Sequence, residues 1–319
     1  MEGLFLAVGA VIVTYNSAEV ILSCLDALAE MAPGVNITVV DNASSDQTLK
    51  NVRQRAGVKI VANPENRGFA AAANQGFRET EADQFLLLNP DVRLKTSIVA
   101  LVEACREHGL AAAQLTGSDG RPQAGFTIRR LPTPASMIFE LLGLNSLWPG
   151  NPVNRAYRYL NRDLNQGGPV EQPAGAMLMI RRDVWERLGG FDESFHPVWF
   201  EDVDFCRRAM DSGYRIEYVP PVRAEHTGGH SVKKLPPIRM QEYWYDSLIR
   251  YAGKHFRPWQ YRAVCLAAVF GTVPRMAAGM IREKNLKPAV SFFKIMRFAG
   301  KRLVLRSSGT PQSGNYKKI

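Results

Sequence analysis

Several of the sequence patterns that mark common enzyme classes are missing from this chain. The segment Thr14–Glu19, which follows the first apolar run, contains no glycine, so the G-x-G-x-x-G fingerprint of a dinucleotide-binding fold is absent. No G-x-x-x-x-G-K-[ST], H-E-x-x-H or G-x-S-x-G pattern occurs either. These absences exclude a P-loop enzyme and an H-E-x-x-H metalloprotease, and they argue against an α/β-hydrolase.

Cysteine is scarce, with 4 residues among 319, and no two of them form a C-x-x-C pair. Neither a zinc ribbon nor a disulfide framework is therefore indicated, and reduced thiols in a cytosolic protein are the simplest interpretation. The remaining composition is typical of a globular protein, since hydrophobic residues make up 46% of the chain and charged residues 22%.

Acidic residues are few in the C-terminal part of the chain. Residues 231–319 contain 18 Lys and Arg but 3 Asp and Glu, a net charge of +15, whereas residues 1–230 contain 22 and 27, a net charge of −5. The basic character of the whole chain, +10, therefore resides in the C-terminal segment. Such a segment is attracted to an anionic surface, either phospholipid or nucleic acid.

Long hydrophobic runs are also rare. The run Leu4–Val13 is too short to span a bilayer, and Glu2 precedes it in place of a basic region, so a buried first strand explains it better than a signal peptide. The segment Ala263–Ile281 has the length of a membrane helix, but it contains Pro274 and Arg275. This composition favours an interfacial or buried helix over a spanning one.

Short apolar runs alternate with helical patterns over the first hundred residues. Strands are predicted at Leu6–Thr14, Asn36–Asp41, Val58–Ala62 and Gln84–Leu88, and helices at Ala18–Met31, Ser45–Ala56, Gly68–Glu79 and Thr96–His108. Strands that alternate with helices predict an α/β fold in which helices cover both faces of a parallel sheet.

The pattern changes after this region. Residues 117–170 are rich in Gly, Pro, Asn and Arg, so an irregular segment of functional or mobile character is expected. A strand at Ala176–Ile180, a helix at Asp202–Ser212 and a strand at Tyr214–Val219 follow, and basic helices are expected after about residue 235. We therefore divide the chain into a domain 1–232, a basic helical region 233–306 and a polar tail 307–319 that is expected to be disordered.

Polar residues follow each of the first four predicted strands. The four segments are Thr14–Ser17, Asp41–Asp46, Asn63–Phe69 and Asn89–Asp91. Each alone is an ordinary turn composition. Because ligands of α/β sheets bind beyond the carboxyl ends of the strands, four such ends on one edge predict a ligand site there.

Two further segments carry candidate chemistry. Glu201, Asp202 and Asp204 fall within four residues where a helix begins, and the helix dipole explains one or two of them. The flanking Trp199 and Phe200 could raise the pKa of a carboxylate into the range of a general base. In the segment HTGGHS (226–231), the first histidine follows a strand in a glycine-containing loop, and a ligand role and a structural role are equally open.

Taken together, these segments resemble a known family. The motifs are VIVTYNS (11–17), VVDNASSD (39–46), NRGFAAAANQG (66–76), LLLNPDV (86–92), GGFDESF (189–195) and FEDVDFCRR (200–208). Over residues 8–232 the chain resembles the family 2 glycosyltransferases with a GT-A fold, and it is most similar to their bacterial rhamnosyltransferase-like branch. The resemblance implies a Rossmann-like, mostly parallel central sheet and a nucleotide-sugar donor whose anomeric carbon is inverted.

The resemblance also implies roles for individual residues. The expected donor-binding residues are Thr14, Tyr15, Asn16, Asp41, Asn42, Asn66, Arg67, Gly68 and Asn89. Asp91 occupies the last position of the family's DxD metal motif, and His226 matches a further metal ligand, which implies Mg²⁺ or Mn²⁺. The sequence departs from the motif at Asn89, where the family often has Asp. Asp202 is the expected general base, with Glu201 as the alternative.

These features predict a hexosyltransferase of polysaccharide or cell wall biosynthesis. The expected reaction moves rhamnose from dTDP-rhamnose, or another sugar, to a hydroxyl of a cell-surface glycan or a polyprenyl-linked precursor. The expected location is cytoplasmic, at the inner face of the cell membrane, with the basic region in peripheral contact with anionic lipid. A cluster of aromatic residues beside these charges suits such an interface, namely Trp244, Tyr245, Tyr251, Trp259 and Tyr261.

Two other functions remain open at this point. A nucleotidyltransferase would have a similar sheet, but it would normally need a glycine-rich, basic loop after the first strand, which TYNSAE does not provide. A nucleic-acid-binding protein would account for the basic C-terminal segment, but no base-stacking or recognition-helix motif occurs, so nucleic acid is not an expected partner.

Overall fold

The computed structural model describes residues 7–228, 236–283, 292–293, 296–297 and 300. The predicted polar tail 307–319 lies outside these residues. The chain forms two compact units, each built from two segments of the sequence. Unit 1 consists of Met1–Leu131 and Asn154–Ser247, and unit 2 consists of Pro132–Val153 and Leu248–Ile319.

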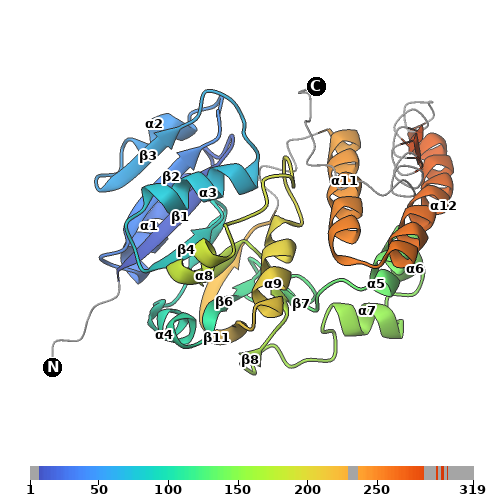
Figure 1. Cartoon of the computed structure of the whole chain (residues 1–319). Helices are drawn as coiled ribbons and strands as arrows, with labels where there is room; N and C mark the ends of the chain where they lie inside the picture. Colours follow the sequence, from blue (N-terminus) through green and yellow to red (C-terminus); the bar gives the residue numbers. More distant parts are fainter. Residues whose placement is uncertain (1–6, 229–235, 284–291, 294–295, 298–299, 301–319) are drawn as a thin grey trace. The chain divides into compact units, whose positions relative to one another are not determined.

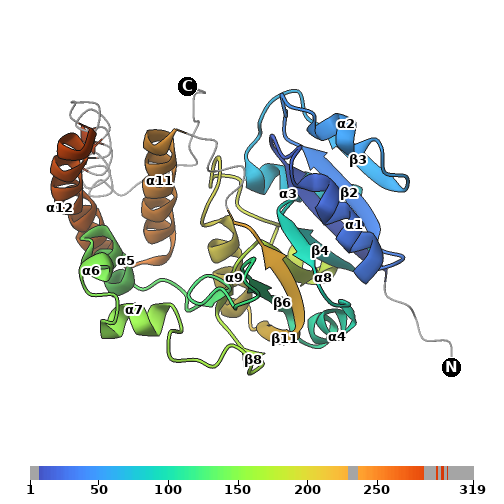
Figure 2. The ribbon, with the colours of Figure 1, turned by 180° about the vertical axis from the view of Figure 1, so that it is seen from behind.

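Unit 1 contains a nine-stranded sheet whose first half is parallel. The strands there are β1 (Val8–Thr14), β2 (Asn36–Asp41), β3 (Val58–Ala62) and β4 (Gln84–Leu88), and their spatial order is β3-β2-β1-β4 (Figures 1 and 2). All three contacts between them are parallel. The predicted parallel sheet is thereby confirmed, and the carboxyl ends of all four strands lie on one edge.

The second half of the sheet is mixed. It contains β10 (Met177–Arg181), β6 (Gly109–Thr116), β11 (Arg215–His226), β5 (Val92–Leu94) and the short β8 (Gly168–Pro169). Because only β10, β5 and β8 run against the other strands of this sheet, it is mostly parallel, as expected.

Two strand predictions in this half are incomplete. The alanine-rich β6 has no β-branched signal in its centre and was not predicted, but it is buried along its whole length between β10 and β11, where small side chains fit. The strand predicted to end at Val219 continues to His226 after an irregularity between Val219 and Arg223. Pro220 and Pro221 cause this irregularity, because proline cannot donate a ladder hydrogen bond.

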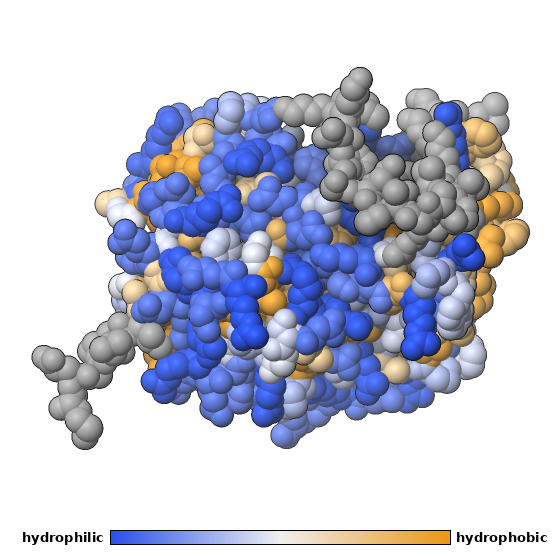
Figure 3. Space-filling view, viewed as in Figure 1, coloured by the Kyte–Doolittle hydropathy of each residue, from blue (hydrophilic) through white to orange (hydrophobic). Residues whose placement is uncertain are grey.

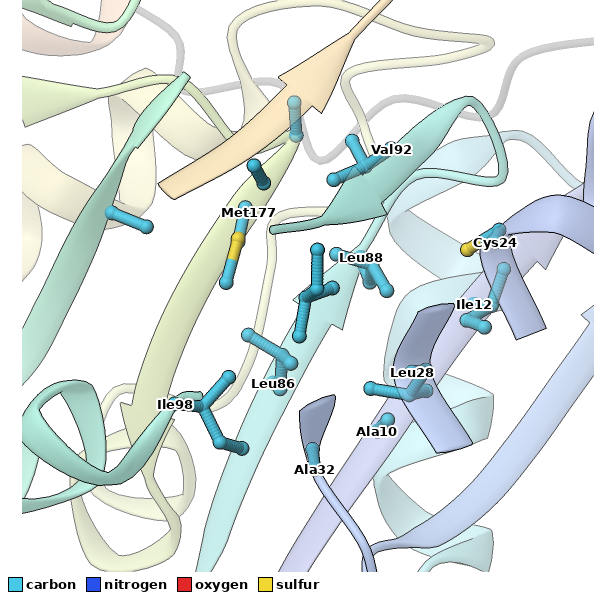
Figure 4. Packing of buried hydrophobic residues seen from close by; sticks show 14 of the residues in the cluster. Ala10, Ile12, Cys24, Leu28, Ala32, Leu86, Leu88, Val92, Ile98 and Met177 are labelled. Atoms are coloured by element: carbon cyan, nitrogen blue, oxygen red, sulfur yellow. The ribbon is translucent and has the colours of Figure 1, made fainter. Parts of the chain in front are cut away.

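Helices cover both faces of the sheet, as predicted. On one face, α1 (Ile21–Met31) and α4 (Val99–His108) pack over the central strands, and Figure 4 shows Leu28 among Ala10, Ile12 and Leu86 of that core. On the other face lie α3 (Phe69–Glu79), α8 (Arg182–Arg187) and α9 (Glu201–Asp211).

Aromatic rings fill the core of this second face. The ring of Phe77 in α3 stacks on Phe85 of β4 with centroids 4.5 Å apart, and Trp185 of α8 meets both rings edge-on. A glycine sets how closely α3 approaches the sheet, because a Cβ at Gly76 would lie 2.3 Å from Val11 Cγ1. These contacts hold the C-terminal half of α3 against the sheet.

The segment 117–170 is less irregular than predicted. It contains β7 (Ile128–Arg129), α5 (Pro134–Leu141), α6 (Leu144–Leu147) and α7 (Pro152–Tyr157), and β7 pairs with β9 (Gln172–Pro173). A capping box begins α5, in which Thr133 and Ser136 exchange hydrogen bonds of 3.1 and 2.9 Å. This local signal, together with Pro134 in the first turn, was available in the sequence.

In unit 2, the long helix α12 (Pro258–Glu283) packs against α5. Backbone contact is close, because a Cβ at Gly271 would lie 1.9 Å from the Leu141 carbonyl oxygen. Arg275 donates to the carbonyl oxygens of Leu141 and Glu140 at 2.5 and 2.6 Å, and so satisfies the C-terminal end of α5. Within the described residues, no helix combines the length and apolar character needed to cross a membrane.

The predicted aromatic interface is wrong for three of its five residues. Tyr245, Tyr251 and Tyr261 are buried, and Tyr245 and Tyr251 belong to α11 (Pro237–His255). Trp259 is 64% exposed, and Trp244 is half-buried. The tyrosines were misassigned because their hydroxyls and the neighbouring charges resemble an interfacial pattern, whereas helical packing turns them inward.

Candidate active site

The loops after β1 and β2 are joined through a buried carboxylate. Asp41 is fully buried and accepts a hydrogen bond from the Thr14 hydroxyl at 2.9 Å. It also accepts from the backbone N–H and the hydroxyl of Ser44, at 2.9 and 2.5 Å. Three donors within the protein therefore hold this carboxylate, which fixes the two loops side by side and leaves Tyr15, half-buried, at their junction.

Asn16 adds a second connection between these loops. Its backbone adopts a left-handed conformation with φ of 51°, which asparagine tolerates better than most residues. The side-chain carbonyl accepts from the Ser45 N–H at 2.8 Å, and the backbone N–H donates to the Ser44 hydroxyl at 2.9 Å. The first predicted donor-binding loop is thus rigidly tied to the second.

Asn42 connects the loop after β2 to the loop after β3. Its side-chain oxygen accepts from the Arg67 N–H at 2.9 Å, while its amide donates to Asn66 Oδ1 at 2.9 Å and to the Gly68 carbonyl at 3.2 Å. The Asn66 and Arg67 side chains are exposed. The structure therefore brings together the eight predicted donor residues from Thr14 to Gly68.

The first N–H groups of α3 are already used within the protein. The Gly68 N–H donates to Asn66 Oδ1 at 2.9 Å, and the Phe69 N–H donates to the Pro197 carbonyl at 2.7 Å. Gly68 has φ of 82°, and a Cβ there would lie 2.7 Å from His196 Cδ2. This glycine therefore allows the 196–200 loop to rest directly on the loop after β3.

Asp91 and His226 form a buried pair at the same edge of the sheet. The antiparallel pairing of β5 with β11 places His226 opposite Val92, so the imidazole Nε2 lies 3.6 Å from Asp91 Oδ1. Gln123 holds the ring from the other side: its amide donates to the His226 carbonyl at 2.7 Å, and its oxygen lies 3.2 Å from Nδ1. Because this oxygen can only accept, Nδ1 carries a proton, and Nε2 is the ring nitrogen on the side of Asp91.

The donor set of this pair fits a divalent cation. A carboxylate oxygen and an imidazole nitrogen, both buried and 3.6 Å apart, are ligand types that Mn²⁺ and Mg²⁺ sites use. No group of three or more His, Cys, Asp or Glu suited to a metal is present in the part of the chain that the structure describes. The protein thus offers two such ligands here, with part-buried Asn89 in place of a further carboxylate.

Asp202 lies close to the end of β4. Its Oδ2 accepts from the Gly175 N–H at 2.9 Å and its Oδ1 from the Val203 N–H at 2.8 Å. The next residue after Gly175, Ala176, accepts from the Asn89 N–H at 2.9 Å. A short chain of contacts therefore links Asp202 to Asn89, at the strand end that also carries Asp91.

The surroundings of Asp202 shift its pKa in opposing directions. Burial raises the pKa of this carboxyl above its ordinary value, while the N–H groups of Gly175 and Val203 and the charge of Arg129 lower it. The residue retains accessible surface. A carboxylate with a raised pKa that can still reach a ligand suits proton abstraction.

Glu201 has a different environment from its neighbour. It is 5% exposed, and its Oε2 has no hydrogen-bond partner in the described part of the chain. Burial, reinforced by the charge of Asp202, raises the pKa of Glu201 well above its ordinary value. Of the two candidate bases, the geometry therefore favours Asp202, which has hydrogen bonds that stabilise its ionised form.

The residues before this pair have a strained backbone. Trp199 and Phe200 have φ of 78° and 70°, a conformation that is unfavourable for bulky side chains and costs about 1–3 kcal/mol each. The turn before these residues is held by α11, because the Ser247 hydroxyl donates to the Val198 carbonyl at 3.1 Å. Backbone strain of this kind is concentrated at functional sites, which supports a functional role for the start of α9.

Sequence reasoning missed four residues that surround the candidate pair and base. Gly175 binds Asp202, and a Cβ at this position would lie 2.9 Å from Asp202 Cβ. Gln123 orients His226, and the Phe126 ring stacks on the imidazole with centroids 5.1 Å apart. Arg129 places its guanidinium 5.9 Å from the Phe126 ring. Three of them come from the segment 117–170. In the sequence of that segment, only the Gly and Arg content indicated a functional role.

Comparison with known families settles the class. A model of glycosyl transferase family 2 matches residues 10–189, more than half of the chain, and a model of glycosyl transferase family group 2 matches residues 156–260. The chain belongs to glycosyltransferase family 2. The predicted family is thereby confirmed, and the nucleotidyltransferase interpretation is not supported.

Related members of family 2 include transferases of known sugars. The N-acetylglucosaminyl-diphospho-decaprenol L-rhamnosyltransferase of Mycobacterium tuberculosis is 28% identical over 71% of this chain and 77% of its own length. The rhamnosyltransferase WbbL of Escherichia coli is 25% identical over 69% of this chain and 83% of its own length.

Solved structures of glycosyltransferases share the fold. The mannosyltransferase PcManGT of Pyrobaculum calidifontis, in complex with GDP-Man and Mn²⁺, has a TM-score of 0.54 at 17% identity and covers 95% of this chain and 88% of its own. S. aureus TarS in complex with UDP-GlcNAc has a TM-score of 0.55 at 16% identity and covers 94% and 82%. The expected GT-A fold is confirmed.

The raised pKa of Glu201 gives a prediction about stability. A carboxyl whose pKa is higher in the folded than in the unfolded state favours folding at low pH, and this contribution is lost as the pH rises through the folded-state pKa. We expect Glu201→Gln to gain stability relative to wild type between pH 4 and pH 7, by about 1.4 kcal/mol per pH unit while the unfolded state alone is ionised.

Urea unfolding at both pH values measures this change. The cost of burying the Gln amide is the same at both, so it cancels in the comparison. Exposed Glu103→Gln is the matched control and should show no such gain. A difference between Glu201→Gln and wild type that is equal at pH 4 and pH 7 would contradict the prediction.

Proposed function

We propose that this family 2 glycosyltransferase inverts the anomeric carbon of a nucleoside-diphosphate sugar and that Asp202 is its general base. The observation that carries the proposal is the position of Asp202. Two backbone N–H groups orient its carboxylate, and contacts through Gly175 and Ala176 link it to the end of β4 beside Asp91. A base linked to the strand end that carries a candidate divalent-cation site suits an inverting transfer.

In the proposed reaction, Asp202 accepts the proton of the acceptor hydroxyl as the hydroxyl oxygen attacks the anomeric carbon. The bond from that carbon to the diphosphate breaks on the opposite face, and the nucleoside diphosphate leaves with the bonding electron pair. No second carboxyl group is required to protonate this leaving group, which differs from glycoside hydrolysis. Glu201, the buried neighbour of Asp202, is therefore not assigned an acid role.

Asp91 and His226 would hold the divalent cation, Mg²⁺ or Mn²⁺. When bound, such a cation neutralises charge on the diphosphate and makes it a better leaving group. Gln123 keeps the Nε2 lone pair of His226 available for this purpose by holding the proton on Nδ1. The Mn²⁺ in the PcManGT structure supports the proposal for this chain.

The tied loops after β1, β2 and β3 are the proposed donor-binding surface. The bonds of Asp41, Asn42 and Asn16 shape it, while the half-buried Tyr15 and the exposed Arg67 would face the nucleotide. Thr14 is occupied by Asp41, so its role would be to position that carboxylate. Asn66 and Gly68 shape the loop that carries Arg67, and Asn89 lies on the neighbouring strand end.

The rhamnosyltransferase relatives support rhamnose, carried by dTDP, as the donor sugar. The decaprenol-linked substrate in the name of the M. tuberculosis relative supports a polyprenyl-linked or cell-surface glycan acceptor. An acceptor of this kind would bring the enzyme to the inner face of the cell membrane.

A donor panel tests the sugar. We expect nucleoside diphosphate release to be at least ten-fold faster with dTDP-rhamnose than with UDP-glucose, UDP-GlcNAc or GDP-mannose, each assayed with Mg²⁺ and with Mn²⁺. The reason is that a pocket built for one sugar leaves polar groups unpaired with another. Faster release from a UDP sugar would contradict the rhamnose assignment, and no release from any donor would contradict the proposed activity.

A further inference from the structure

The helix α12 has two different faces. The face towards α5 is buried and contains Tyr261, Val264, Cys265, Ala268 and Thr272. The opposite face is exposed, yet it is also largely apolar: Trp259 is 64% exposed, Leu266 46%, Phe270 65%, Val273 47% and Ile281 78%. We call this set the α12 stripe. A helix of a globular protein normally carries polar residues on its exposed side.

The spacing of the α12 stripe places its members on one side of the helix. Successive members are separated by seven, four, three and eight residues, all of which return to the same side of an α-helix. Figure 3 shows apolar surface along the side of the molecule where α12 is labelled in Figure 1. Contiguous apolar surface of this kind marks an interaction site.

A second exposed apolar group lies in the same unit. Leu147 at the end of α6 is 82% exposed and Trp148 is 62% exposed. The helix α6 begins after Gly143, whose added Cβ would lie 4.0 Å from the Arg275 guanidinium of α12. Exposed apolar side chains therefore occur on both α12 and the helix that starts beside it.

We infer that the α12 stripe docks onto the surface of an anionic lipid bilayer, with the helix lying in the plane of the interface. Trp and Phe are favoured at the boundary between headgroups and acyl chains, and Leu, Val and Ile are favoured below it. Arg275 does not oppose this placement, because its guanidinium caps α5 on the protein side. The inference deepens the proposed use of a lipid-linked acceptor, on which its functional meaning rests.

The positive charge of unit 2 favours an anionic bilayer, rather than a second copy of the chain, as the partner of the α12 stripe. Unit 2 contains 15 Lys and Arg against 2 Asp and Glu, a net charge of +13. Arg262 lies exposed on α12 between the first two stripe residues, and Arg257 lies exposed just before the helix. A second copy would bring another unit of the same high positive charge to the stripe, whereas anionic headgroups complement it.

Vesicle flotation with the full chain tests this inference. We expect wild type to float with vesicles of phosphatidylglycerol and phosphatidylcholine and to bind vesicles of phosphatidylcholine alone more weakly. The double variant Leu266→Gln/Phe270→Gln should lose at least ten-fold in partitioning, which corresponds to about 1.4 kcal/mol. Val99→Gln, which removes a 61% exposed apolar side chain from α4, is the matched control and should float as wild type does.

The double variant should keep its circular dichroism spectrum and melting temperature, because both side chains are exposed. Flotation of the double variant equal to wild type would overturn the inference. So would a wild-type dimer that the double variant converts to a monomer, since the stripe would then bind a second copy. Nucleoside diphosphate release is measured on the same samples: release without flotation overturns the lipid inference alone, and flotation without release overturns the proposed activity alone.

Discussion

Asp202→Asn is expected to reduce sugar transfer by about 10²- to 10⁴-fold while nucleotide-sugar binding stays within a few-fold of wild type. The substitution keeps the size of the side chain but removes the group that accepts the acceptor proton, and a positioned general base contributes about 10²–10⁴-fold. Steady-state kinetics gives the rate, and isothermal titration with the donor gives the affinity. A loss confined to the rate distinguishes a base from a donor-binding residue.

The matched control is Asp211→Asn on the same helix. Asp211 is exposed and pairs with Arg207, so its loss should leave both parameters unchanged. Wild-type activity should also fall below a pH set by Asp202, because only the ionised carboxylate accepts a proton and burial raises its pKa. Turnover of Asp202→Asn within three-fold of wild type would refute the assignment of the base.

Asp91→Ala is expected to weaken donor binding in the presence of Mn²⁺ by about 10- to 100-fold and to remove most of its dependence on the metal. Asp91 supplies the carboxylate of the candidate cation pair, and the diphosphate would lose the positive charge that the cation provides there. Titration of the nucleoside diphosphate with Mn²⁺ and with EDTA measures the effect. His226→Ala should act in the same direction.

Two controls test whether the effect is specific to a cation held by Asp91. Asp119→Ala, which removes an exposed carboxylate from the loop after β6, should bind the donor as wild type does. Wild type in EDTA should resemble Asp91→Ala in Mn²⁺. If EDTA leaves the wild-type affinity unchanged, Asp91 and His226 do not hold a cation needed by the donor.

The parallel half of the fold could be predicted because its central strands, β1 and β4, are buried on both faces. Such strands are continuous apolar runs, and the predicted bounds of β2, β3 and β4 are the observed ones. The rule that ligands bind beyond the carboxyl ends of strands then groups Asp41, Asn66 and Asp91 at one edge from the sequence alone.

The strands in the second half of the sheet are determined by contacts with distant parts of the chain. Alanine has high helix propensity, so the Ala111–Ala113 run gave no strand signal, and burial between two strands decided its structure. The double proline at 220–221 suggested the end of a strand, although β11 resumes at Arg223 and brings His226 to Asp91. The contacts of Gly175 and Gln123 join residues 27 and 103 positions apart, which no local pattern reveals.

The cap that Arg275 places on α5 links two regions that are far apart in the chain. Unit 2 is built from 132–153 and from residues after 247, so Leu141 is synthesised 134 residues before Arg275. At a synthesis rate of about 5–20 residues per second, Leu141 waits roughly 7 to 27 s for Arg275. Unit 2, which carries the positive charge, therefore assembles late in the synthesis of this enzyme.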